Sequence, residues 1–238
     1  DPLVQAVEAA ARAGIIVVAA SGNYGVAQHT GQPGYAGVLS PGNAPSAITV
    51  GSVKTFDTDT RSDDRVAEYS SRGPTWYDGV AKPDLVAPGH GLTSVAARSS
   101  SLYLDYDSLR VGKYYLRLTG TSMAAAVVSG TAALIVQAHR DAFPTAPPLT
   151  PNAVKAILQY TALPVRADDG RRYDFLTQGT GSVNSAGAVE LAAHIDTSAP
   201  LSTQWLTGNV STSTVIDNET LAWAGNIMWA DAVGSGIV

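Results

Sequence analysis

The chain has 238 residues, a formal net charge of −5 and 15% charged residues, a length that fits one large domain or a domain with a smaller extension. It contains no cysteine, which excludes disulfides, thiol catalysis and thiolate metal sites. Acidic and basic residues are interspersed without a basic run, which argues against nucleic acid, and polar residues interrupt every long apolar stretch, which argues against a membrane-spanning segment.

The first elements predict the second half of a parallel α/β unit. Apolar residues in 1–13 recur at helical spacing between an Asp-Pro start and Gly14. Residues 15–20 form a short apolar run rich in β-branched residues, which predicts a strand buried on both faces. We therefore expect the chain to lack the segment that begins the sheet.

A polar turn follows this strand and reads Ala20-Ser21-Gly22-Asn23. It lies at the carboxyl end of a parallel strand, where open α/β sheets place their ligands. Ser-Gly-Asn is also a common turn sequence, so a purely structural role stays open. His29 lies in the loop that follows, on the ligand side of the sheet.

The middle of the chain alternates loops and strands. The Gly- and Pro-rich segment 29–46 predicts a long loop, and 47–53 predicts a second buried strand. The charged segment 56–65 predicts a solvated surface loop. Segments 92–97 and 113–119 then predict a hairpin whose long tip is polar and rich in Tyr.

The register of this hairpin decides where His90 lies. If Leu92 pairs with Leu118, His90 falls opposite Gly120, two residues before Ser122. A slip of one residue would turn His90 to the other face, because side chains alternate along a strand.

The stretch 119–138 predicts the central helix of the molecule. After Gly120 and Thr121 its residues are small or apolar for more than four turns, which is typical of a buried helix. Ser122 would lie at the helix N-terminus, where unpaired amides and the helix dipole favour negative charge. This is a favourable place for a nucleophilic hydroxyl, although Thr121 or Ser122 could also serve only as a helix cap.

Two more helices and a different tail complete the chain. Thr150-Pro151 begins a helix over 153–161, and a Gly-rich turn leads to a helix over 186–193. Residues 196–238 are rich in Ser, Thr and Trp, which predicts a β-rich or partly ordered extension. We therefore divide the chain into residues 1–195 and a tail over 196–238.

The segment Gly120-Thr121-Ser122-Met123-Ala124, followed by a small-residue helix, resembles the nucleophile segment of the subtilisin-like serine proteases. Segments 69–74 and 82–89 and the closing turn and helix also resemble this family, so the resemblance covers about residues 1–195. It implies a partial subtilisin-like three-layer α/β fold with a parallel sheet, plus the β-rich carboxyl-terminal extension. The chain departs from the family where Pro and often His follow the nucleophile, since it has Ala126 and Val127 there.

The resemblance implies a secreted serine endopeptidase that hydrolyses polypeptides through an acyl-enzyme. Ser122 would be the nucleophile, and the side-chain amide of Asn23 would donate to the developing oxyanion, a contribution of roughly 3 kcal/mol. The residues expected to bind substrate are small: Ala20, Ser21, Gly22, Gly120 and Thr121.

The acid and the histidine of the family's triad precede Asn23 in sequence, and neither motif occurs in this chain. The base is therefore expected from a missing segment, or it is improvised from His90 or His29. His139 lies ~25 Å along the helix from Ser122, too far to act as its base. Because the acid of the family's triad lies far upstream of this position, Asp84 is interpreted as structural.

The remaining expectations concern partners and an alternative function. No cofactor is required, although calcium is possible because the family often binds it in loops. An exposed edge of the parallel sheet would invite a missing amino-terminal segment or self-association. The alternative is a catalytically inactive α/β module whose Trp-rich tail binds a partner.

Overall fold

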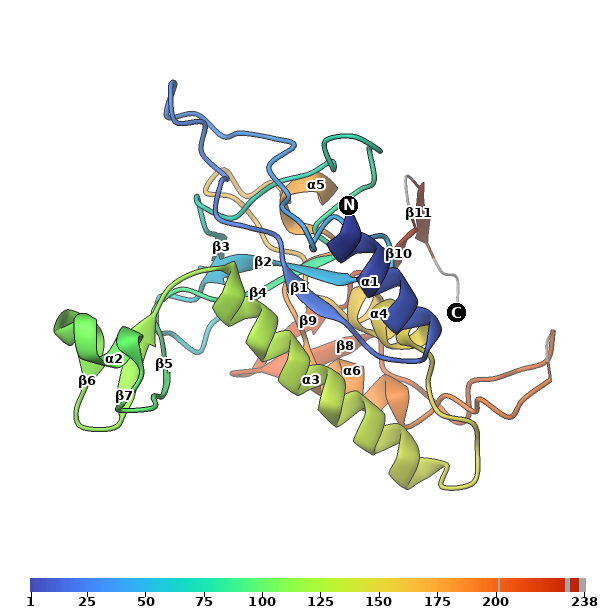
Figure 1. The fold of residues 1–238 in the computed structure, drawn as a ribbon. Coiled ribbons are helices and arrows are strands. Elements are labelled where there is room, and N and C mark those ends of the chain that lie inside the picture. The colour runs from blue at the N-terminus through green and yellow to red at the C-terminus, as the bar shows by residue number, and fades with distance from the viewer. Residues whose placement is uncertain (201, 230–231, 236–238) are drawn as a thin grey trace.

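The computed structural model describes residues 1–200, 202–229 and 232–235 (Figure 1). Its central sheet contains the parallel strands β1 (Val18–Ala20), β2 (Ile48–Lys54) and β4 (Leu85–Pro88), with β2 in the middle. The short strand β3 (Arg65–Val66) pairs antiparallel with the end of β2. The predicted α/β fold with a parallel sheet is therefore confirmed.

Five helices surround this sheet in the described part of the chain: α1 (Pro2–Arg12), α3 (Thr121–Ala142), α4 (Pro151–Tyr160), α5 (Phe175–Gln178) and α6 (Ser185–Ala192). The short α5 lies in the turn that sequence patterns had shown only as Gly-rich. The predicted helix starts are confirmed by their caps, because the Asp1 carboxylate accepts from Leu3 N at 2.8 Å and Thr150 Oγ1 accepts from Ala153 N at 3.2 Å.

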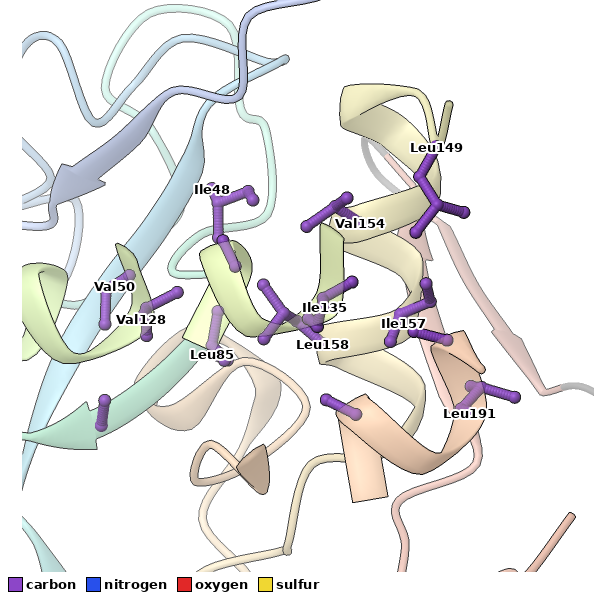
Figure 2. Packing of buried hydrophobic residues seen from close by; sticks show 14 of the residues in the cluster. Ile48, Val50, Leu85, Val128, Ile135, Leu149, Val154, Ile157, Leu158 and Leu191 are labelled. Carbon is purple, nitrogen blue, oxygen red and sulfur yellow. The ribbon is translucent and has the colours of Figure 1, made fainter. Parts of the chain in front are cut away.

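The main hydrophobic core lies where α3, α4 and α6 pack together against the sheet (Figure 2). Strands β2 and β4 contribute side chains from one side, and the three helices contribute them from the other. The labelled members are all buried: Ile48, Val50, Leu85, Val128, Ile135, Leu149, Val154, Ile157, Leu158 and Leu191. This packing fixes the direction of α3 relative to the carboxyl ends of the strands.

One side of the domain is less buried than the sequence pattern predicts. The prediction that residues 15–20 form a strand buried on both faces is wrong, because only Val18–Ala20 are strand and Ile15 is 58% exposed. Helix α3 is likewise buried on one face only, and Leu134 on the other face is 55% exposed. Among the described residues nothing pairs with the free edge of β1.

Helix α3 also meets a simple test for membrane spans, since its 22 residues include a window of mean hydropathy 1.5. Core helices of globular proteins pass the same test. In this molecule the helix contacts β1, β2 and β4 along one face.

The predicted hairpin before α3 is confirmed with its register. Strands β5 (Leu92–Val95) and β7 (Tyr115–Leu118) pair with Leu92 opposite Leu118. The long polar tip lies between these strands as expected, and it has structure of its own: α2 (Ser101–Asp105), a 3-10 turn and a third strand, β6 (Arg110–Val111), which pairs with β7. We call residues 92–118 the arm; Figure 1 shows it projecting from the body at the start of α3.

The carboxyl-terminal extension is β-rich, as predicted. It contains two hairpins, β8 (Ser213–Ile216) with β9 (Glu219–Ala222) and β10 (Asn226–Trp229) with β11 (Ala232–Ser235). Trp223, between the hairpins, joins the main core and meets the Tyr160 ring edge-on at 6.4 Å. Residues 201, 230, 231 and 236–238 of the predicted tail lie outside the described residues, and the division at residue 195 stays a prediction.

A buried polar cluster beneath the sheet explains Asp84. Its Oδ2 accepts from Lys82 Nζ at 2.8 Å and from Thr49 N at 2.7 Å, and its Oδ1 accepts from Lys155 Nζ at 2.9 Å and from Gln159 Nε2 at 3.1 Å. Burial opposes ionisation of this carboxyl, but Lys155 and Lys82 outweigh burial and lower its pKa. Asp84 is therefore a structural anion, as the sequence interpretation held.

A second buried carboxyl, Asp64, is poorly compensated. Its Oδ1 has no hydrogen-bond partner among the described residues, and its Oδ2 lies 3.4 Å from Arg61 Nη1. Burial raises the pKa of Asp64 from 3.8 to about 6, against the opposing attraction of Arg61. The side chain thus favours the folded state when protonated, and this contribution is lost as pH rises through 6.

We therefore expect the Asp64→Asn variant to gain stability relative to the wild type as pH rises. The gain between pH 4 and pH 8 should be about 2–3 kcal/mol, because each unit of pKa shift corresponds to about 1.4 kcal/mol. Urea unfolding of both proteins at the two pH values measures it. A difference that does not change with pH contradicts the prediction.

Candidate active site

The start of α3 is shaped by Gly120, not by a side-chain cap. Gly120 is the N-cap residue with φ 153°, its N donates to Gly89 O at 2.8 Å, and no side chain caps the helix. A Cβ at this position would lie 3.4 Å from Asn23 Nδ2. Ser122 is therefore the second residue of α3, and the interpretation of Thr121 or Ser122 as a mere cap is wrong.

The Asn23 side chain is held in one orientation by Thr121. Asn23 Oδ1 accepts from Thr121 N at 3.0 Å and from Thr121 Oγ1 at 3.1 Å. Because Thr121 N is a donor, the amide oxygen must face it, and Nδ2 is left on the side of Gly120. Thr121 Oγ1 also accepts from Gly22 N at 3.2 Å, which ties the turn after β1 to the helix start.

Ser122 lies exposed beside this amide. In the part of the chain that the structure describes, neither its Oγ nor its N has a hydrogen-bond partner. Asn23 Nδ2 also has no hydrogen-bond partner among the described residues, so Ser122 N and Asn23 Nδ2 offer two donors near a helix N-terminus, where the helix dipole also favours negative charge. This arrangement can stabilise an oxyanion that forms on a carbonyl carbon attacked by Ser122 Oγ.

The Leu92–Leu118 register is as predicted, but the ladder ends there and Gly120 N donates to Gly89 O, so His90 is not paired with Gly120 and does not reach the nucleophile. Its exposed ring stacks on Tyr69 with 6.1 Å between centroids and 22° between planes. The hydrogen bond from Lys54 lowers the pKa of Glu68, and the nearby His90 adds to this effect. No hydrogen bond joins His90 to Ser122 in the described structure.

The other histidines also lie apart from Ser122. His29 is exposed at the tip of a loop that Val26 and Pro33 close with an isolated bridge. His139 is buried near the far end of α3, where burial lowers its pKa, and its Nε2 lies 3.3 Å from Thr197 Oγ1. The structure thus brings Asn23, Gly120, Thr121 and Ser122 together, and none of the described histidines with them.

The small residues expected to bind substrate differ in their exposure and in the space around them. Gly22 has φ 106°, and a Cβ there would lie 2.9 Å from Ser71 Oγ, so glycine is required. Ala20 is half-buried, whereas Ser21 is fully buried. Ser21 as a whole residue has no exposed surface, and its expected place in the wall of a substrate pocket stays a prediction.

Gly89 is a site residue that sequence patterns did not identify. Its O accepts from Gly120 N, and a Cβ at Gly89 would lie 2.7 Å from Gly120 O and 2.5 Å from Ser52 Oγ. Only glycine lets the end of β4 approach the start of α3 this closely. The signal in the sequence was a glycine directly after the strand.

No group of three or more His, Cys, Asp or Glu side chains in the described part of the chain is placed to hold a metal ion. Calcium, which the resemblance led us to consider, stays a prediction.

Comparison with known proteins gives relatives in sequence. The serine protease AprX of Bacillus subtilis (strain 168) is 41% identical over 191 residues, which cover 79% of this chain and 38% of AprX. Pyrolysin of Pyrococcus furiosus is 31% identical over 215 residues, which cover 81% of this chain and 14% of pyrolysin. The chain therefore spans less than half the length of either relative.

Comparison with solved structures finds a protease with a similar fold. The structure of the patellamide maturation protease PatA matches with a TM-score of 0.55 and 23% identity, over 80% of this chain and 56% of PatA. The family model described as the subtilase family, Peptidase S8, matches residues 1–190. The chain, with its free serine and anchored asparagine at the start of α3, therefore belongs to the subtilase family.

Proposed function

We propose that the chain supplies the nucleophile and the oxyanion site of a serine endopeptidase that hydrolyses polypeptides. The observation that carries this proposal is the amide of Asn23, held by Thr121 so that its Nδ2 lies near Gly120, two residues before the exposed Ser122. A turn with only a structural role would not need a fixed, unpaired donor next to an exposed serine. Membership of the subtilase family supports the same reaction.

In the proposed reaction, Ser122 Oγ attacks the carbonyl carbon of a peptide bond and gives its proton to a base. The negative charge on the carbonyl oxygen is stabilised by Asn23 Nδ2 and Ser122 N. The tetrahedral intermediate collapses, the amine leaves with the proton, and an ester on Ser122 remains. Water then attacks the ester and releases the acid, which restores Ser122.

We propose that the base comes from a polypeptide segment that packs on the open side of the domain. This side combines the free edge of β1 with the bare face of α3. A groove of about 610 Å³ runs between them, lined by residues that include Ile16, Val18, Ala133 and Val136. Such a strand edge with an apolar floor suits another strand with its helix, or a second copy of this chain.

His90 and His29 remain the proposed improvised bases if no such segment is present. His90 is the better placed of the two, because Gly89 and Gly91 both bond to the strand that leads to Ser122. A rotation of its ring away from Tyr69 would be needed before it could accept the serine proton. We also propose secretion, which the resemblance to subtilisin-like proteases implies.

The alternative, an inactive module with a binding tail, rests on the exposed rings of Trp205 and Trp229. Trp223 does not support it, because this side chain is buried in the main core.

Casein hydrolysis by the wild type, the Ser122→Ala variant and the His90→Gln variant tests the proposal. Cleavage that is lost in Ser122→Ala but kept in His90→Gln places the base elsewhere; loss in both variants makes His90 the base. Cleavage that persists in Ser122→Ala contradicts the assigned nucleophile. If no protein cleaves casein, the reactivity of Ser122 toward a fluorophosphonate with added imidazole decides between an incomplete and an inactive site.

A further inference from the structure

The arm has one covered face. Tyr103 of α2 and Leu116 of β7 are both buried. Tyr103 Oη donates to Lys113 O at 2.8 Å, and the Arg110 guanidinium lies 4.3 Å from the Tyr103 ring centroid. The strands lie in the order β5-β7-β6, and these contacts tie α2 to β6 and to the turn between β6 and β7.

The opposite face of the arm carries an apolar row without a covering element. Val95 pairs with Tyr115, and Tyr115 pairs with Val111, so the three side chains lie in one line across the sheet. They are 77%, 46% and 42% exposed, in the order Val95, Tyr115 and Val111. Leu116, the next residue of β7, points to the covered face because side chains alternate along a strand.

Strand β7, which carries the middle residue of this row, continues along the chain to the proposed nucleophile. Strand β7 ends at Leu118, Gly120 begins the turn into α3, and Ser122 is the second residue of the helix. At 3.3 Å per residue, Tyr115 lies about 17 Å along the chain from Gly120. An extended peptide would cover that length with about five residues.

Strand β7 is tied to the body of the domain between the row and Ser122. Arg117 shares the face of Tyr115, and its Nε donates to Gly91 O at 2.9 Å while its Nη2 lies 3.0 Å from Asp57 Oδ2. These bonds connect β7 to the turn after β4 and to the loop after β2.

We propose that this row is an accessory binding surface for an extended polypeptide substrate, which it contacts through apolar side chains five to six residues from the scissile bond. The proposal rests on the proposed function and names its substrate class, long and locally unfolded chains. A second copy is a poorer occupant, because three side chains cover far less than the ~800 Å² that each partner of a stable complex buries.

The test measures binding without catalysis, in the Ser122→Ala protein. Three fluorescent peptides share a central octapeptide: the octapeptide alone, a 16-residue peptide with Leu six residues on either side of the central bond, and the same 16-mer with Ser there. Fluorescence anisotropy should show the Leu 16-mer binding about tenfold more tightly than the other two. Replacing Val95, Val111 and Tyr115 with Thr, which keeps β propensity, should remove this tenfold gain and leave octapeptide affinity unchanged.

Val215→Thr is the matched control, since Val215 is an exposed valine on the remote strand β8. Equal affinity of the wild type and the triple variant for the Leu 16-mer overturns the proposal, as does an equal loss in Val215→Thr. The proposal is also overturned if the triple substitution changes the sedimentation of the protein or its binding to phosphatidylcholine vesicles but leaves its affinity for the Leu 16-mer unchanged. If circular dichroism shows that the triple variant misfolds, Val95→Thr alone, on the edge strand β5, must weaken Leu 16-mer binding by about threefold.

The proposed function fails on a different readout. If Ser122 of the wild type does not react with a fluorophosphonate, the catalytic proposal is overturned whether or not the Leu 16-mer binds. Conversely, a reactive Ser122 with no preference for the Leu 16-mer overturns only the accessory surface.

Discussion

The Asn23→Ala variant should react at Ser122 about 10²–10³-fold more slowly than the wild type with a fluorophosphonate, whose phosphoryl oxygen takes the place of the oxyanion. This is the usual size of the loss when one donor of an oxyanion site is removed. In this chain the loss follows because Asn23 Nδ2 is a fixed and unpaired donor beside Gly120. The second-order rate of labelling measures it.

Two variants sharpen this test. Thr121→Val removes one of the two bonds to Asn23 Oδ1 and keeps the backbone bond, so a smaller loss, of about tenfold, is expected. Asn209→Ala, at an exposed position of the tail, should leave the rate unchanged. Equal labelling rates in Asn23→Ala and the wild type, with thermal unfolding unchanged, would remove Asn23 from the oxyanion site.

The Asp84→Asn variant should lose about 3–5 kcal/mol of unfolding free energy at pH 7, because it leaves two buried ammonium groups without their anion. Lys82 and Lys155 both direct Nζ at the Asp84 carboxylate. Burial lowers the pKa of Lys82 to about 8 even with this anion present, which shows how costly its charge is inside the protein. Urea unfolding measures the loss.

The sign of the pH dependence follows from the lowered pKa of Asp84. Its contribution is present above pH 3.8 and is lost as pH falls through the folded-state pKa, so the two proteins should converge in acid. Asp105→Asn, at an exposed carboxylate on the arm, should change stability by less than about 0.5 kcal/mol. A loss in Asp84→Asn no larger than that in Asp105→Asn contradicts the buried-cluster account.

Sequence patterns predicted the framework of the site well where local signals agreed. The small-residue run of α3 and the caps at Asp1 and Thr150 are each set by neighbouring residues. The turn at Asn23 could be located because it directly follows a β-branched strand. Its role came from family resemblance, and its anchoring by Thr121 could not be foreseen because the two residues are 98 positions apart.

The side chains that were wrongly predicted to be buried share one physical cause. Apolar periodicity shows which side chains prefer burial, but it does not show whether another element is present to cover them. Ile15 and Leu134 fit buried positions by composition and are exposed, because the free edge of β1 has no neighbour among the described residues. The third strand of the arm was missed because β6 has only two residues, too few for alternation to be recognised.

Labelling of Ser122 tests the central claim most directly. The wild type and Ser122→Ala would be treated with a fluorophosphonate, with and without imidazole as an external base, and the modified serine identified by mass spectrometry. Ser129, which is exposed on the same helix with its Oγ bonded to Ala125 O, serves as an internal control. The account predicts that imidazole accelerates labelling of Ser122 alone; labelling of Ser122 no faster than that of Ser129 contradicts it.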